Sequence, residues 1–333
     1  MAVFGCAGCG AALTVAVSRV VRPVHLADSH WEMLHPPLLE AGTYAVDHER
    51  FGAPWRTWEE VGAAEAAARG YFVEFWGNLS DGPPDTLLFA PGDLPGTALI
   101  PERNEGHCLG IDGSGGPNLA CLDCGRPVGW RIDDCGQWQV ARLLPEAVRL
   151  PGPPERPVMD WAELTAEGAL WPGLGEYRHI PAGVALAHAV VATGGGPVVA
   201  APGPVAGLFG RALAALLPAG TGATRLDLAG PGLGEPDAEL VLVPVHPQTG
   251  EVWRPGGGAV PVPVEAALWA ELAFPVHRTR LPAVGGLPPG VERDDPLPPH
   301  PPARPSGNAY RYTVARLPVG REPWLRALHA RWH

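Results

Sequence analysis

The pattern Cys-x-x-Cys-Gly occurs twice in this chain of 333 residues, at 6–10 and at 121–125. Four thiolates form a typical ligand set for a structural zinc ion, which holds its ligands in a tetrahedron. Each Cys-x-x-Cys turn places two sulfurs on one side of an ion, and the glycine after it lets backbone amides turn toward the thiolates. We therefore expect one structural Zn²⁺ bound by Cys6, Cys9, Cys121 and Cys124; two separate free or redox-active pairs are the alternative.

The two cysteine pairs are far apart in the sequence, with 111 residues between Cys9 and Cys121. This spacing is too long for a simple zinc ribbon, so the metal is expected to connect the first hairpin of a domain to its last. Closing so long a loop restrains the unfolded chain, and structural zinc can contribute on the order of 10 kcal/mol to folding. The cysteine spacing thus predicts one N-terminal domain that includes both pairs.

A proline-rich segment, PGPPERP at 151–157, has no periodic apolar pattern and is typical of a linker. All six cysteines of the chain precede it. We therefore predict an α+β protein with two domains: a mainly β, zinc-linked domain over 1–150 and an α/β domain over 158–333.

Short apolar runs bounded by glycine, proline and aspartate predict strands in the first domain. The clearest runs are at 13–21, 128–132 and 138–143. Segment 57–70 predicts a short helix, because Thr57 can cap its start with Glu60 three residues later, and Gly70 can end it.

In the second domain, apolar runs that read as strands alternate with segments of helical periodicity. The predicted strands are at 188–192, 197–201, 224–230 and 238–245, and the predicted helices are at 204–220 and 264–272. Asp160 and Glu163 resemble a capping box that opens a further helix. The proline-rich stretch 281–309 is expected to be extended and irregular.

The charged residues exclude several functions. All 24 basic residues are arginine, so a Walker phosphate loop and Schiff-base chemistry on lysine are ruled out. The net charge is −11, and residues 1–150 carry 10 arginines against 19 acidic residues. An acidic domain is a poor match for a phosphate backbone, so we expect no nucleic-acid partner.

The N-terminal sequence MAVFGCAGCG has neither a positive start nor an apolar run before a cleavage site, so no signal peptide is expected. The longest uncharged stretch, 180–210, is interrupted by prolines and glycines, which disfavours a membrane helix. We expect a cytoplasmic protein without a membrane partner. Cysteines in that compartment favour metal or redox roles over structural disulfides.

An opening CxxC, a long β-rich insert, a second CxxC and then Val128, Gly129, Trp130 and Arg131 resemble the β-tent fold. That group includes the type B methionine sulfoxide reductases, the Yippee proteins and the thalidomide-binding domain of cereblon. In the latter two, the second pair is followed by Leu or Ile, Gly, Trp and a basic or aromatic residue. The resemblance implies a β-tent-like fold with a structural zinc ion, and it covers 1–150 at most.

Two activities that the resemblance implies require residues that this sequence lacks. The reductases use a cysteine on a strand beyond the last zinc ligand, but the matching segment, 138–148, contains none. The cereblon-type ligand cage uses three tryptophans, and only Trp130 corresponds to one of them, although Trp138, Trp55 or Trp58 could supply another wall. Trp130 is therefore a candidate ligand contact, and a core position beside the zinc is the alternative.

These observations favour a zinc-stabilised binding protein whose partner is a protein or a small-molecule ligand. Four thiolates leave no open coordination position, so the metal is expected to be structural and not catalytic. A second hypothesis is an enzyme whose active site lies in the α/β domain or in the cleft between the domains, where His246 and His277 follow apparent strands. A third is a thiol redox enzyme that uses Cys108 and Cys135, which are otherwise expected to be buried structural thiols.

Overall fold

The computed structural model describes residues 1–24, 35–75, 77–104, 111–149, 157–166, 175–275 and 304–329. The chain combines helices with several sheets, so the predicted mixed α+β class is confirmed. It divides into two compact units. The first unit comprises Met1–Asp160, Val245–Glu251 and Ser306–His333, and the second comprises Trp161–Pro244 and Val252–Pro305.

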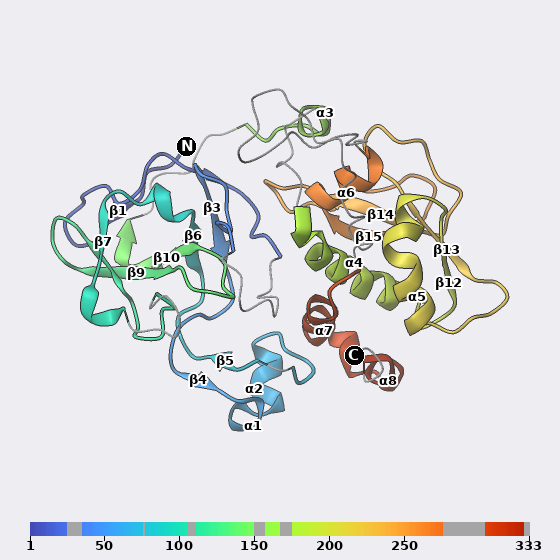
Figure 1. Cartoon of the computed structure of the whole chain (residues 1–333), viewed down its shortest axis with the longest axis horizontal. Coiled ribbons are helices and arrows are strands. Elements are labelled where there is room, and N and C mark those ends of the chain that lie inside the picture. The colour runs from blue at the N-terminus through green and yellow to red at the C-terminus, as the bar shows by residue number, and fades with distance from the viewer. Residues whose placement is uncertain are drawn as a thin grey trace, which may run out of the picture. The chain divides into compact units, whose positions relative to one another are not determined.

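A seven-stranded sheet forms the centre of the first unit (Figure 1). In spatial order its strands are β2 (Ser18–Arg19), β3 (Thr43–Asp47), β6 (Thr86–Phe89), β10 (Val140–Leu143), β9 (Pro127–Ile132), β8 (Leu119–Cys121) and β7 (Thr97–Leu99). Neighbouring strands are antiparallel except β2 and β3, which are parallel. The strands predicted at 128–132 and 138–143 correspond to β9 and β10.

The prediction of one strand over 13–21 is wrong in its extent, because only Ser18 and Arg19 form a regular strand. The preceding residues instead make isolated contacts with the N-terminus. The amide of Leu13 donates to the carbonyl oxygen of Phe4 at 2.8 Å, and Val17 forms a bridge with Ala2. Alternating apolar residues therefore reach the core here without an extended ladder.

Apolar side chains of these strands pack into one core with the N-terminal segment. The rings of Phe4, Tyr44 and Phe89 meet with centroids 4.9 to 5.9 Å apart. Cys6 and Cys121 belong to the same buried cluster. β1 (Gly5–Cys6) pairs with β11 (Val148–Arg149), so the start of the chain lies beside the end of the predicted first domain.

Between β3 and β6 the chain forms a small lobe of β4 (Trp55–Arg56), α1 (Trp58–Val61), α2 (Ala63–Ala68) and β5 (Leu79–Ser80). Thr57 and Glu60 form the predicted capping box at the start of α1. The predicted single helix is divided in two by Gly62, whose φ of 79° is not helical.

Two segments from beyond 158 belong to the first unit, which differs from the predicted assignment of 158–333 to one second domain. The last helices are α7 (Gly307–Ala315) and α8 (Pro323–His329). The amide of Phe72 donates to the carbonyl oxygen of Ala315 at 2.7 Å, and that of Val21 to Pro247 at 2.8 Å. No pattern in the sequence predicts these long-range backbone hydrogen bonds. The predicted linker, 151–157, lies almost entirely outside the described residues.

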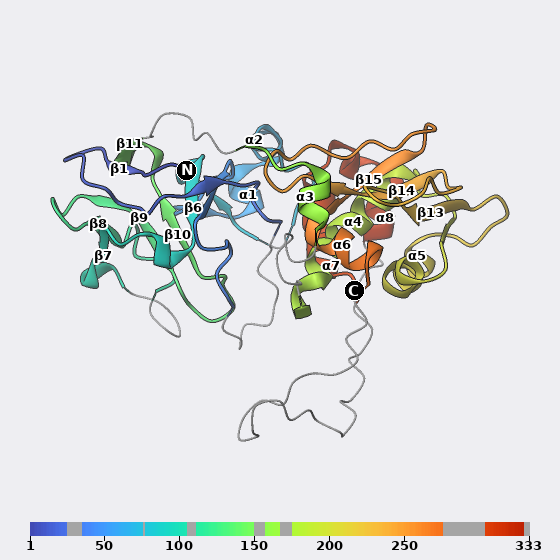
Figure 2. The same ribbon diagram turned by 90° about the horizontal axis from the view of Figure 1, so that it is seen from above.

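The second unit has a four-stranded sheet in the order β12 (Val198–Ala200), β13 (Thr224–Leu228), β14 (Leu240–Val245), β15 (Val260–Glu265). The first two pairings are parallel, and Figure 2 labels β13, β14 and β15 next to one another. Its helices are α3 (Trp161–Thr165), α4 (His179–Ala192), α5 (Arg211–Leu216) and α6 (Ala266–Ala273). Strands predicted at 197–201, 224–230 and 238–245 correspond to β12, β13 and β14.

The prediction of a strand at 188–192 is wrong, because these residues form the last turns of α4. The helix is buried on nearly all sides, with Ile180, Ala185, Leu186 and Val190 in the core. A helix that is apolar all round has no 3.6-residue pattern, so its end cannot be distinguished by periodicity from a buried strand. Among the described residues, no helix is both long enough and apolar enough to cross a membrane.

A substitution at Gly129 tests the close approach of β9 and β10. A Cβ atom at this position would lie 1.9 Å from the carbonyl oxygen of Arg142, so the strands would have to separate. We expect Gly129→Ala to lower the free energy of unfolding by about 1–3 kcal/mol. Gly92→Ala is the matched control, because a Cβ there meets no atom within 4 Å. Denaturant unfolding of both variants measures the effect, and equal stability would contradict it.

Candidate metal centre

The two Cys-x-x-Cys-Gly segments adopt the same local conformation. In the first, the amide of Gly10 donates to the carbonyl oxygen of Cys6 at 2.8 Å; in the second, Gly125 donates to Cys121 at 2.9 Å. Both glycines have positive φ, 82° and 69°. Side chains are strained in that conformation, so glycine is required where each turn closes. The fifth residue of the pattern thus shapes both turns.

The four thiols converge on one point. Each Sγ atom lies within 4.8 Å of the other three, and the Cys6–Cys124 and Cys9–Cys121 pairs are both 3.7 Å apart. Disulfide sulfurs are about 2.05 Å apart, so these cysteines are free thiols. A tetrahedral ion with metal–sulfur bonds of about 2.3 Å requires sulfurs about 3.8 Å apart. The four cysteines therefore can hold one metal ion, and their geometry fits it.

The protonation of these thiols shows what a cation would change. Burial would raise the pKa of Cys6, but amides of Cys9 and Gly8 and the neighbouring sulfurs lower it to about 7. For Cys9, the amide of Ala11 lowers the pKa, whereas burial and the three other sulfurs raise it to about 12. Four thiolates at this distance repel one another, so full deprotonation requires a bound positive charge.

The centre has a buried side and an exposed side. Cys6 and Cys121 are buried in the core cluster, whereas Cys9 and Cys124 are exposed. Arg149 donates to the carbonyl oxygen of Ala7 at 3.4 Å within the first segment. A tetrathiolate with a divalent ion carries a net charge of −2, and an arginine beside it offsets part of that charge.

The segment that contains Gly96 connects the two cysteine turns. The amide of Leu122 donates to the carbonyl oxygen of Gly96 at 3.0 Å, and the amide of Gly96 donates to that of Leu13 at 3.1 Å. A Cβ on Gly96 would lie 2.0 Å from the carbonyl oxygen of Ala12. Backbone contacts thus hold the two turns together in addition to any metal.

Trp130 occupies a core position on β9, with 3% of its surface exposed. Phe51 packs edge-on against its ring at 5.4 Å, and the backbone of Gly52 lies close to the ring. Within the described residues its indole N–H has no hydrogen-bond partner. Trp55 packs against Phe51, which also contacts Trp130, and Trp138 lies beside His35. Ligand contact through Trp130 stays a prediction.

The remaining candidate residues have other surroundings. Cys135 is half-buried, and its amide donates to the carboxylate of Asp134 at 2.6 Å. Its predicted redox partner Cys108 lies outside the described residues, so that pairing stays a prediction. His246 is buried; its Nε2 bonds the carbonyl oxygen of Met159 at 3.0 Å, and its Nδ1 accepts from two amides. The His246 side chain therefore stabilises the turn that follows it. His277 lies outside the described residues.

One partly buried acid in the second unit, Glu265, has no counterpart in the sequence analysis. Oε2 of Glu265, at the end of β15, is buried and accepts no hydrogen bond within the part of the chain that the structure describes. Burial raises the pKa of this carboxyl to about 7. Nothing in the sequence distinguishes it from an exposed glutamate, because burial depends on the packing of distant segments.

Removal of an exposed ligand tests the metal site with little effect on the core. We expect Cys9→Ser to remove the bound metal, because three thiolates bind a tetrahedral ion much more weakly than four. Cys135→Ser, outside the cluster, is the control and should keep the metal content of the unaltered chain. Elemental analysis of the purified variants measures the metal content. Unchanged metal in Cys9→Ser would contradict the site.

The pKa of Glu265 gives a pH dependence whose sign is defined. The folded-state pKa, about 7, exceeds the ordinary value of 4.5, so the folded state retains a proton and loses stability as pH rises between these values. Replacing Glu265 with Gln should therefore stabilise the protein by on the order of 1–3 kcal/mol at about pH 8, and much less at about pH 5. Urea unfolding at both pH values measures this. The exposed Glu235→Gln is the control, and a similar gain there would contradict the assignment.

Comparisons with protein-family models, with curated proteins and with solved structures return no match to this chain.

Proposed function

We propose that the first unit is a zinc-stabilised binding module in which the metal is structural. The observation that supports this most directly is the convergence of four sulfurs at the spacing of a tetrahedron. A catalytic zinc ion keeps one position open for water or substrate, whereas four thiolates fill all positions of a tetrahedral ion. Zn²⁺ bound by Cys6, Cys9, Cys121 and Cys124 would therefore stabilise the fold and leave binding to other surfaces.

We also propose that the first unit has a β-tent-like fold. This proposal rests on the four cysteines and on the residues that follow the second pair. β9 carries the Val-Gly-Trp sequence two residues after the second cysteine turn, and it is antiparallel to both of its neighbours. Gly129 is required there by the close approach of Arg142. Trp130 is required as a large ring in the core beside Phe51. Physical roles of this kind support a shared architecture, and they favour a stabilising role for the motif over a ligand cage.

We further propose that the partner is a protein or a small-molecule ligand and that the protein acts in the cytoplasm. Reduced thiols are the form that a metal requires, and the cytoplasm maintains it. The acidic surface disfavours nucleic acid.

An enzymatic role of the second unit is the second candidate, and it is favoured by the Oε2 atom of Glu265, which is buried and accepts no hydrogen bond from the residues that the structure describes. A carboxyl with a pKa of about 7 has the protonation state of a general acid near neutral pH. If the intact chain turns over a substrate, Glu265→Gln should abolish that turnover while the fold is retained. Turnover that survives the substitution would remove this candidate.

Removal of the metal is the test of the proposed function. Chelation should lower the midpoint of thermal unfolding, because the metal bound to the folded state contributes to its stability, and added Zn²⁺ should restore it. The purified chain should contain one zinc ion per molecule. A different metal, or a chain without metal that unfolds at the same temperature, would contradict the proposal.

A further inference from the structure

A polar cavity of about 270 Å³ lies in the first unit, between the end of β3, the small lobe and the end of α7. It is distinct from the cysteine centre and shares no residue with it. The ionisable residues that line it are His48, Glu49, Arg50, Arg69 and Arg316. The cavity thus gathers three arginines in a chain whose net charge is −11.

The negative charge of Glu49, the acid in the wall of this cavity, is compensated by neighbouring groups. Glu49 accepts hydrogen bonds from the hydroxyls of Tyr71 and Tyr312, and it pairs with Arg22 at 3.3 Å and with Arg316 at 3.8 Å. Burial, and then the Glu49 carboxylate, raise the pKa of both tyrosines, so their hydroxyls remain protonated donors. Glu49 therefore does not make the cavity attractive to a cation.

Two further ionisable groups of the wall, Arg69 and His48, have carboxylate partners as well. Arg69 pairs with Asp81 at 2.7 Å and with Glu65. His48 pairs with Asp85 at 2.6 Å. These carboxylates fix the side chains of Arg69 and His48 in the wall of the cavity. Neither side chain is therefore available as the main contact for a ligand.

Arg50 and Arg316 retain unused donors. Arg50 is exposed, and in the described ranges it has no carboxylate partner; it donates one hydrogen bond, to the carbonyl oxygen of Gly82 at 3.1 Å. The Nη1 of Arg316 is buried and makes no hydrogen bond in the described part of the chain, because the carboxylate it pairs with, that of Glu49, lies 3.8 Å away, beyond hydrogen-bond distance. A guanidinium group has five N–H donors arranged to match the oxygens of a carboxylate or phosphate.

The aromatic residue of the cavity does not offer a free ring face. The guanidinium of Arg316 lies 4.3 Å from the centre of the Tyr71 ring, and Phe75 stacks on the same ring with centroids 5.0 Å apart. A base or another flat ring therefore cannot stack there. The remaining attraction is the unused arginine donors.

We propose that this cavity binds a small ligand through an oxyanion group, a carboxylate or a phosphate, held by Arg50 and Arg316. The proposal specifies the ligand class for the binding role proposed above, on which it rests, but it does not depend on the cysteines. Charge-assisted bonds from arginine to such oxygens are among the stronger polar contacts in proteins. The volume restricts the ligand to a small molecule.

The test is a calorimetric titration of the full, metal-loaded chain with inorganic phosphate and, separately, with succinate at matched ionic strength. We expect saturable binding of at least one probe, and the preferred probe identifies the oxyanion. Arg50→Gln should weaken it by about tenfold or more, and Arg50→Lys should have an intermediate effect. Because Arg50 is exposed, both variants should retain the unfolding temperature of the unaltered chain.

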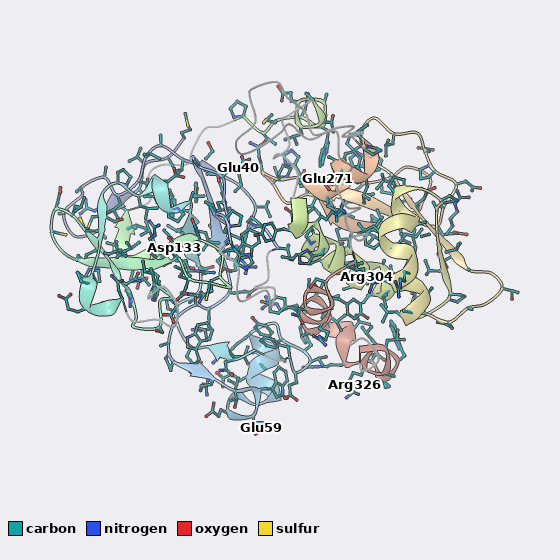
Figure 3. The ribbon with its side chains drawn as sticks, in the orientation of Figure 1. Glu40, Glu59, Asp133, Glu271, Arg304 and Arg326 are labelled. Atoms are coloured by element: carbon teal, nitrogen blue, oxygen red, sulfur yellow. The ribbon has the colours of Figure 1, made fainter. Side chains whose placement is uncertain are left out.

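Arg326→Gln is the matched control, because Arg326 is an exposed arginine on α8 outside the cavity (Figure 3). It should bind the probe like the unaltered chain. Absence of saturable binding to both probes, or equal weakening by Arg50→Gln and Arg326→Gln, would overturn the inference. Metal content is measured on the same samples: a zinc-loaded chain without binding refutes the cavity alone, and a chain without zinc refutes the proposed metal role.

Discussion

Repulsion among four thiolates is the constraint on which the first unit depends. The sulfurs of Cys6, Cys9, Cys121 and Cys124 lie within 4.8 Å of one another, so they cannot all be charged without a cation between them. Cys6 and Cys121 also belong to the hydrophobic core, so the same residues join the centre to the packing of the sheet. A change at the centre therefore reaches the strands directly.

A second set of charges connects the sheet to the last helices. Asp47 on β3 is buried and pairs with Arg142 on β10 at 2.6 Å and with Arg22 at 3.0 Å. Burial would raise the pKa of Asp47, but the two arginines hold it below its usual range. Two residues later, Glu49 receives the hydroxyl of Tyr312 from α7. Removing one partner of such a buried pair leaves an uncompensated charge, which is costly.

The sequence revealed those features whose chemistry is local. The four cysteines could be found because each pair is a short pattern with its own glycine, and α1 because Thr57 and Glu60 are three residues apart. The end of α4 could not be found from the sequence, because a helix that is buried on nearly all sides shows no 3.6-residue periodicity of apolar residues. Glu49 and Tyr312 are 263 residues apart and belong to no motif, so their contact and the cavity beside Arg50 were not predictable.

The contact between Glu49 and Tyr312 also bears on the order in which the chain becomes structured during synthesis. Both cysteine turns are synthesised before α7, so a metal ion can join β1 to β8 before α7 is made. Tyr312 and Ala315 on α7, which bond Glu49, Tyr71 and Phe72, are translated only after the second unit. Until then the nascent sheet exposes Glu49 and the face of Tyr71 to solvent. The first unit can therefore be completed only after the whole second unit has been synthesised.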